Sequence, residues 1–158
     1  MDFEKLKKKP VKLIMENNIL DDVIYLNDNL EKLFRLTETK LDHSFRDFLI
    51  VILNESNFVQ HIITYREFED YMNIFRAFVN KIEDKDKPID ANVSELNLNK
   101  FKIKINNNAV NSNTEVEDAL NIVKENKLEV LVVVDSEKKY LGKIKRSSLK
   151  KRVNELLD

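Results

Sequence analysis

Two short stretches place hydroxyl, acidic and basic side chains at the expected start of a helix. In the first half, Thr64 is followed three positions later by Glu67, and in the second half Lys145, Arg146 and Ser148 occupy the corresponding place. Threonine is a favoured residue at the start of a helix, so Thr64 is a candidate N-cap. The spacing of Thr64 and Glu67 also fits a capping box, in which the two side chains only fix the helix end.

The chain lacks most of the residues on which covalent catalysis and metal binding depend. It has no cysteine and only two histidines, His43 and His61, so disulfides and thiolate metal sites are excluded. A zinc enzyme or a serine hydrolase would need one of these histidines in its site. The single glycine, Gly142, excludes the glycine-rich phosphate loops of P-loop and dinucleotide-binding proteins. The sequence therefore favours a protein that is not an enzyme and has no metal site.

Length and composition indicate a globular protein of one domain or two small subdomains. The chain has 158 residues, of which 42% are hydrophobic and 35% are charged, with a formal net charge of −1. This charge balance argues against a general nucleic-acid binder, because such proteins carry a basic excess. No apolar run is long enough to span a membrane, and the charged N-terminus does not resemble a secretory signal. We expect a soluble cytoplasmic protein that does not bind membranes.

The sequence contains two copies of one pattern. In each copy an aliphatic run ends at a polar residue, Asn54 or Asp135, and a polar turn leads to a second apolar segment. The interval from Asn54 to His61 equals the interval from Asp135 to Gly142. Equal intervals are typical of a duplicated unit.

Hydrophobic periodicity predicts the same order of elements, β-α-β-β-α, in both copies. In the first copy we expect strands at 22–26, 48–53 and 58–64 and helices at 28–36 and 65–82. In the second copy we expect strands at 108–110, 128–135 and 140–145, an extra strand at 101–105, and helices at 115–127 and 147–157.

The first copy is longer than the second between its first helix and its buried strand. We expect Asn27 to cap that helix in the first copy, and Asn113 or Thr114 to cap it in the second. Measured from Asn27 and Asn113 to the end of the buried strand, the first copy has five extra residues. We expect the extra residues within 37–47, in a loop that places His43 on the surface.

With this order of elements, the chain resembles a tandem pair of CBS domains, the regulatory module named after cystathionine β-synthase. The second copy carries the resemblance most clearly, in the helix with "EDAL", the buried strand that ends at Asp135, and Gly142 after the turn. The first copy carries it in "VKLIM", "LNDNLEKLF" and "IITYREF". The resemblance implies an α/β (α+β) fold in which two β-α-β-β-α repeats pack as a pseudo-twofold pair. The corresponding division of the chain is an N-terminal extension at 1–10, a first repeat at 11–80, a linker at 81–92 and a second repeat at 93–158.

The resemblance also implies a class of ligand. In the family, clefts between paired repeats hold adenosine-containing ligands such as AMP, ADP, ATP, S-adenosylmethionine and, in some bacterial members, cyclic di-AMP. The binding pattern is a glycine, two residues, a serine or threonine, two residues and an aspartate. The hydroxyl residue begins the last helix near the phosphate, and the aspartate accepts hydrogen bonds from the ribose.

The first copy follows this pattern with two replacements. His61 stands in place of the glycine, Thr64 matches the hydroxyl position, and Glu67 stands where the aspartate is expected. Tyr65, next to Thr64, is a further candidate contact. The alternative is that Thr64 and Glu67 only cap the helix.

The second copy departs from the pattern in a different way. Gly142 matches the glycine, but Lys145 stands at the hydroxyl position and Ser148 at the acidic position. The ribose carboxylate is lost, whereas Lys145 and Arg146 are placed to meet a phosphate. The alternative is that the basic run at 143–152 is a solvated face.

Two functions remain open at this point. The first is a regulatory module that binds an adenine nucleotide, requires no other cofactor, forms a homodimer and signals to a partner protein of unknown identity. The second is a structural or protein-interaction module whose nucleotide sites have decayed, as the replacements at His61, Lys145 and Ser148 suggest.

Overall fold

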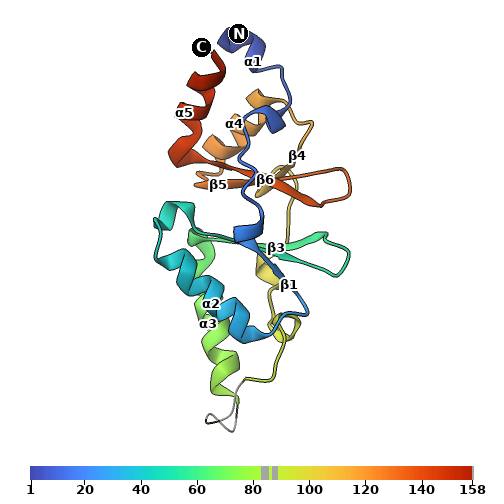
Figure 1. Cartoon of the computed structure of the whole chain (residues 1–158), viewed down its shortest axis with the longest axis vertical. Helices are drawn as coiled ribbons and strands as arrows, with labels where there is room; N and C mark the ends of the chain where they lie inside the picture. The colour runs from blue at the N-terminus through green and yellow to red at the C-terminus, as the bar shows by residue number, and fades with distance from the viewer. Residues whose placement is uncertain (83–85, 87–88, 158) are drawn as a thin grey trace. The chain divides into compact units, whose positions relative to one another are not determined.

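The chain forms two compact units, each built around one three-stranded sheet (Figure 1). The computed structural model describes residues 1–82, 86 and 89–157. Unit 1 comprises Met1–Asp21 and Ile103–Asp158, and unit 2 comprises Asp22–Lys102. The predicted mixed α/β fold with a duplicated unit is therefore confirmed. The predicted linker at 81–92 includes 83–85 and 87–88, which lie outside the described residues.

The sheet of unit 2 places its most apolar strand at the centre. The strands β1 (Val23–Tyr25), β2 (Leu49–Leu53) and β3 (Val59–Thr64) have the order β1-β2-β3. Strand β2 pairs parallel with β1 and antiparallel with β3. All five residues of β2 are buried, as the continuous aliphatic sequence predicts.

Two helices cover one face of this sheet, as Figure 1 shows. They are α2 (Leu30–Leu41) and α3 (Phe68–Asn80). Leu33 of α2 and Tyr71 and Phe75 of α3 are buried in one cluster with the isoleucines of β1, β2 and β3. These residues recur at helical spacing, so the apolar face predicted for each helix is the face that packs on the sheet.

Unit 1 repeats this arrangement. Its sheet has the order β4 (Ala109–Asn111), β5 (Val130–Val134) and β6 (Tyr140–Lys145), with the same parallel and antiparallel pairings. The two sheets even share a register shift at corresponding positions of their central strands. The helices are α4 (Val116–Glu125), α5 (Arg146–Leu157) and a short N-terminal α1 (Phe3–Leu6).

Short 3₁₀ turns connect these elements. In unit 1 the described turn is Val11–Leu13, and Leu20–Asp22 joins the two units. In unit 2 the turns are Phe45–Asp47, Tyr65–Glu67, Val93–Glu95 and Asn99–Phe101. The predicted loop at 37–47 is only partly a loop, because α2 continues to Leu41 and the turn Phe45–Asp47 follows. His43 is exposed in this loop, as expected.

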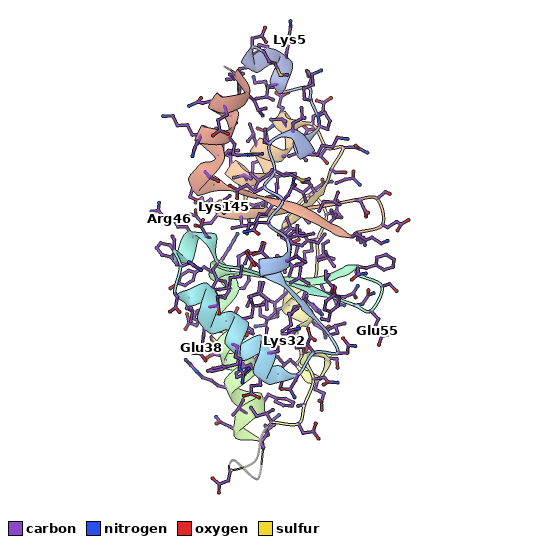
Figure 2. All side chains as sticks on the ribbon, viewed as in Figure 1. Lys5, Lys32, Glu38, Arg46, Glu55 and Lys145 are labelled. Carbon is purple, nitrogen blue, oxygen red and sulfur yellow. The ribbon has the colours of Figure 1, made fainter. Side chains whose placement is uncertain are left out.

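The polar residues that end the central strands build the same turn in both units. The side chain of Asn54 accepts hydrogen bonds from the N–H groups of Ser56 and Phe58 at 2.9 and 3.0 Å. Asp135 accepts the equivalent pair of bonds, from residues two and four positions later, at 2.8 and 2.9 Å. Figure 2 shows Glu55 in the turn of unit 2. Because Asn and Asp can bond to the backbone ahead of them, both turns form without glycine.

The first helix of unit 2 begins later than expected. The predicted cap, Asn27, is wrong, and Asn29 caps α2 by accepting a bond from the N–H of Glu31 at 2.8 Å. The reason is the neighbouring Asp28, whose carboxylate accepts a bond from the N–H of Tyr25 at 2.8 Å. This bond closes a turn that the chain must complete before the helix can start.

The equivalent helix of unit 1 is displaced in the same direction. Neither Asn113 nor Thr114 caps α4, and Glu115 holds the N-cap position. The side chain of Asn111 accepts a bond from the N–H of Asn113 at 2.9 Å, and the backbone N–H of Thr114 bonds to Asn111 at 3.0 Å. The predicted caps, Asn113 and Thr114, therefore belong to a turn at 111–114 that precedes the helix.

The extra strand predicted at 101–105 is also wrong. The segment starts in the turn Asn99–Phe101 and makes only single-residue bridges, Lys102 with His61 and Ile105 with Ala109. The N–H of Lys104 bonds to the side chain of Asn108 at 2.7 Å, so the chain turns back before a ladder forms. The turn therefore forms in place of the strand that the alternation of apolar and charged residues predicts.

Residues 1–21, which include the start of the predicted first repeat, belong to unit 1. The N–H groups of Val11 and Lys12 bond to the carbonyl oxygens of Thr114 and Ser112 at 2.7 and 3.4 Å. At the edge of β6, Glu16 and Lys143 exchange two backbone hydrogen bonds of 2.7 and 2.9 Å. Compact units in space need not coincide with repeats in sequence, so the division at 11–80 and 93–158 stays a prediction. No helix of the described residues is long and apolar enough to cross a membrane.

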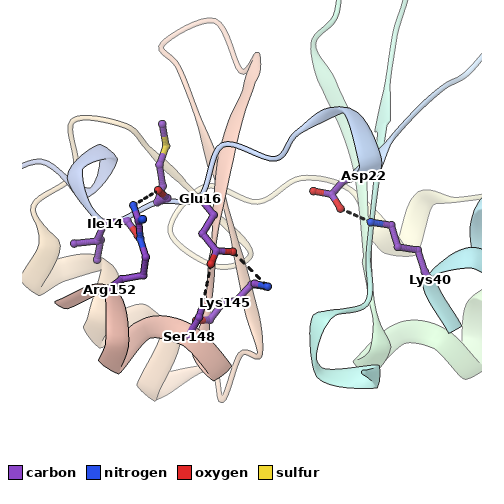
Figure 3. A network of polar contacts seen from close by, with 8 residues as sticks. Ile14, Glu16, Asp22, Lys40, Lys145, Ser148 and Arg152 are labelled. Carbon is purple, nitrogen blue, oxygen red and sulfur yellow. Dashed lines mark hydrogen bonds and ion pairs between the residues drawn. The ribbon is translucent and has the colours of Figure 1, made fainter. Parts of the chain in front are cut away.

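A buried ion pair joins the start of β1 to the end of α2 in unit 2. Asp22 is fully buried and Lys40 is 8% exposed, and the ammonium of Lys40 donates to the carboxylate of Asp22 (Figure 3). Removal of one partner leaves a buried charge without compensation. We expect Lys40→Met to lower the free energy of unfolding by about 3–5 kcal/mol in urea titrations.

Arg35 of the same helix provides the control. Its guanidinium pairs with Glu31 at 3.1 Å on the surface, so Arg35→Met should cost no more than about 0.5 kcal/mol. Equal losses in the two variants would show that the buried pair is no more important than a surface pair.

Candidate functional site

In unit 2, Thr64 and Glu67 form a capping box at the end of β3. The backbone N–H of Thr64 donates to Oε2 of Glu67 at 2.9 Å, and the Thr64 hydroxyl donates to the same oxygen. The box fixes the turn Tyr65–Glu67, which continues into α3. The capping interpretation of this pair is therefore confirmed. Both bonds end on Oε2, so the capping box does not use Oε1 of the carboxylate.

Tyr65, the residue after Thr64, belongs to a group of aromatic rings. Its ring stacks on Phe68, with centroids 5.6 Å apart and planes 7° apart, and it contacts Phe45 at 5.1 Å. Tyr65 is 43% exposed and Phe45 is 52% exposed. Thr64, Glu67 and Tyr65 are therefore brought together at one accessible place on unit 2.

His61 occupies the place of the glycine in the binding pattern, and its pKa is lowered. Burial lowers its pKa, the nearby charge of Lys102 lowers the pKa further, and a hydrogen bond to the backbone of Leu98 opposes both effects. Among the described residues, the buried Nδ1 of His61 has no hydrogen-bond partner. The imidazole is therefore a partly buried side chain at the position of the glycine.

The lowered pKa of His61 predicts a pH dependence of stability. In the unfolded chain His61 binds a proton below about pH 6.5, whereas in the folded chain it does so only at lower pH. The unfolded state therefore holds more protons in this range, and stability should fall as pH drops below about 6.5. We expect His61→Gln to reduce this fall in urea unfolding measured between pH 8 and pH 5.

The exposed His43 supplies the comparison. The variant His43→Gln makes the same substitution at an exposed position and is the matched control for it. If His61→Gln and the unchanged protein lose stability equally on acidification, His61 does not have the lowered pKa.

In unit 1, Gly142 lies against Met15 and Glu16 of residues 14–16, which we call the crossing segment. A Cβ atom at this position would lie 2.5 Å from the carbonyl oxygen of Glu16 and 3.0 Å from Sδ of Met15. No side chain fits at such a distance from a backbone oxygen, so the close approach requires glycine. Gly142 thus explains how residues 15 and 16 reach the edge of β6.

The candidate residues of unit 1 meet an acidic side chain of the same unit. The hydroxyl of Ser148 donates to Oε1 of Glu16 at 2.9 Å, and Nζ of Lys145 lies 3.5 Å from Oε2 (Figure 3). The side chains of Lys145 and Glu16 are only 23% and 24% exposed. Arg146, the first residue of α5, is exposed. The carboxylate of Glu16 therefore lies where the sequence predicts the anionic part of a ligand.

Arg152 holds the same crossing segment from α5. Its guanidinium donates to the carbonyl oxygens of Met15 at 2.8 Å and Ile14 at 3.4 Å (Figure 3). The basic run is thus only partly a solvated face. Three of its members, Arg146, Lys150 and Lys151, are exposed, whereas Lys143 is buried and Lys145 and Arg152 are bonded within the unit.

Glu16 was missed by the sequence reasoning. It is the only acidic residue between Pro10 and Leu20, far along the chain from the helix that it contacts. Only an indirect signal was present in the sequence. Where the family pattern has a hydroxyl residue and an aspartate, this chain has Lys145, a cation, and Ser148, a hydrogen-bond donor. A cation and a donor side by side favour binding of an anion, and a glutamate distant in the sequence can supply that anion as well as a ligand can.

Replacement of the glycine tests the close approach at β6. We expect Gly142→Ala to lower the free energy of unfolding by about 1–3 kcal/mol, because its Cβ would overlap the carbonyl oxygen of Glu16. Lys150→Ala, at an exposed position of α5, is the control and should change stability by less than about 0.5 kcal/mol. An unchanged Gly142→Ala protein would mean that the crossing segment is not held as described.

Comparison with known proteins identifies the class to which this architecture belongs. Residues 104–155 match the CBS domain family. This part of the chain is a CBS domain, and it contains Gly142, Lys145 and Ser148. No curated protein matches the sequence of the chain.

Solved structures extend the fold to nearly the whole chain. CBSX2 in complex with AMP is similar over 95% of this chain and 99% of its own, with a TM-score of 0.64 and 14% identity. The CBS domain of a bacterial CNNM/CorC family Mg²⁺ transporter in complex with ATP is similar over 96% and 91%, with a TM-score of 0.56 and 15% identity. The CBS domains of a transcriptional regulator from Streptococcus pneumoniae are similar over 90% and 97%, with a TM-score of 0.57 and 13% identity. At these identities the likeness shows the fold, which is that of a tandem pair of CBS domains.

Proposed function

We propose that the protein is a regulatory module that binds an adenosine-containing nucleotide at Thr64, Tyr65 and Glu67 of unit 2. Binding changes the module's affinity for a partner protein, and no covalent chemistry is involved. A ligand can act in this way only if it binds one arrangement of the module better than another. A homodimer is part of this proposal, as is the absence of catalytic activity.

The free oxygen of Glu67 carries the proposal. The capping box uses Oε2, so Oε1 remains available to accept a hydrogen bond from a ribose hydroxyl. A carboxylate acceptor gives a stronger bond than a neutral group does. Because the same box fixes the side chain of Glu67, little side-chain entropy is lost when a ligand binds.

The similar structures support the choice of ligand class. CBSX2 was solved with AMP, and the CBS domain of the Mg²⁺ transporter was solved with ATP. Both ligands contain a ribose, whose hydroxyls can donate to the carboxylate of Glu67. The nature of the base and the number of phosphates are open to the experiment below.

A second candidate function is a structural or protein-interaction module without a nucleotide site. The observation that favours it is that Thr64 and Glu67 already satisfy each other, so both have a structural role without any ligand. The first proposal nevertheless accounts for an acidic residue and an exposed Tyr65 at the same place, which capping alone does not require.

Glu67→Gln separates the two roles of this residue. Glutamine also completes a capping box, so the helix start should remain intact. It removes the charged acceptor, and a hydrogen bond to a charged group contributes about 1.5–3 kcal/mol. We expect the unchanged protein to bind at least one of AMP, ADP, ATP, S-adenosylmethionine, NAD or cyclic di-AMP in isothermal titration calorimetry, and Glu67→Gln to bind it at least about tenfold more weakly.

Glu69→Gln is the matched control, because Glu69 is exposed in the first turn of α3 and outside the capping box. It should bind the nucleotide as the unchanged protein does. Absence of binding by the whole panel at millimolar concentration would reject the proposed function and favour the interaction module. Equal affinity of Glu67→Gln and the unchanged protein would reject the site.

A further inference from the structure

The crossing segment of unit 1 brings a carboxylate to the start of α5, where Lys145 offers a cation and Ser148 a hydroxyl donor. Glu16 accepts a hydrogen bond from Ser148 at 2.9 Å and lies 3.5 Å from the ammonium of Lys145. We call these three residues the Glu16 cluster. All three side chains are partly buried, so the contact is better shielded from water than a surface ion pair.

The backbone holds Glu16 in this position independently of its side chain. Glu16 and Lys143 exchange two backbone hydrogen bonds, and the guanidinium of Arg152 bonds to the carbonyl of Met15 at 2.8 Å. The absence of a side chain at Gly142 lets the segment lie against β6. The carboxylate is therefore delivered to Lys145 and Ser148 at a high effective concentration, which a ligand in solution must overcome.

We propose that Glu16 is a built-in anion that closes the site of unit 1 to phosphate-bearing ligands. An incoming phosphate and the Glu16 carboxylate would compete for the same donors, Lys145 and Ser148, and their like charges would repel each other. The unit 1 site thus takes a phosphate monoester only when Glu16 is turned away or neutralised. This inference concerns unit 1 alone and does not depend on the nucleotide proposed for unit 2.

The test follows backbone amide signals of the full chain by NMR while AMP is added to millimolar concentration. In the unchanged protein the amides of 145–148 should not shift. In Glu16→Ala, which removes the charge and the carboxyl group, they should shift in a saturable way, with an affinity at least about tenfold higher than in the unchanged protein. Glu16→Gln, which removes the charge and keeps the shape, should fall between the two.

Glu137→Gln is the matched control, because Glu137 is an exposed glutamate of the same unit that pairs with Lys139 at 3.5 Å. It should behave as the unchanged protein does. The dispersion of the same spectra shows whether each variant is folded. Shifts at 145–148 that are equal in the unchanged protein and Glu16→Ala would overturn the proposal, as would their absence in a folded Glu16→Ala.

The same spectra report on the two proposals separately. Shifts of the amides of 64–67 test the nucleotide site of unit 2, and shifts of 145–148 test the closure of unit 1. If the amides of 64–67 do not shift, while those of 145–148 shift in Glu16→Ala, the first proposal is rejected and the second is supported.

Discussion

The close packing of residues 15 and 16 against Gly142 is the contact on which the architecture of unit 1 depends. Glycine is needed there because any Cβ atom would overlap the carbonyl oxygen of Glu16. This approach lets Glu16 pair with the backbone of Lys143. It also determines the chemistry of the site, because the same pairing brings the carboxylate of Glu16 to Ser148.

The two units show how one scaffold supports two different sites. Unit 2 has His61 at the position of Gly142 and keeps an acidic residue, Glu67, that is fixed by its own helix start. Unit 1 has lost the acidic residue at Ser148 and receives an acidic side chain, Glu16, from another segment. The fold alone therefore does not determine function, since the residues placed on it decide what each unit can bind.

The sequence predicted the elements well where strong local patterns act alone. The buried strands, the amphipathic helices and the turns at Asn54 and Asp135 were correct, because hydrophobic periodicity and side-chain-to-backbone bonds depend on near neighbours. The caps of α2 and α4 were misplaced, because adjacent Asp and Asn residues compete for the same backbone groups. The role of Glu16 could not be predicted, because its partners are distant in the sequence and meet it only through the fold.

A crystal structure of the protein with AMP would test the central claim most directly. The account predicts a nucleotide at unit 2 whose ribose contacts Oε1 of Glu67, while Glu16 in unit 1 remains bonded to Ser148. A nucleotide bound to Lys145 and Ser148 with Glu16 turned away, and none at Glu67, would contradict it.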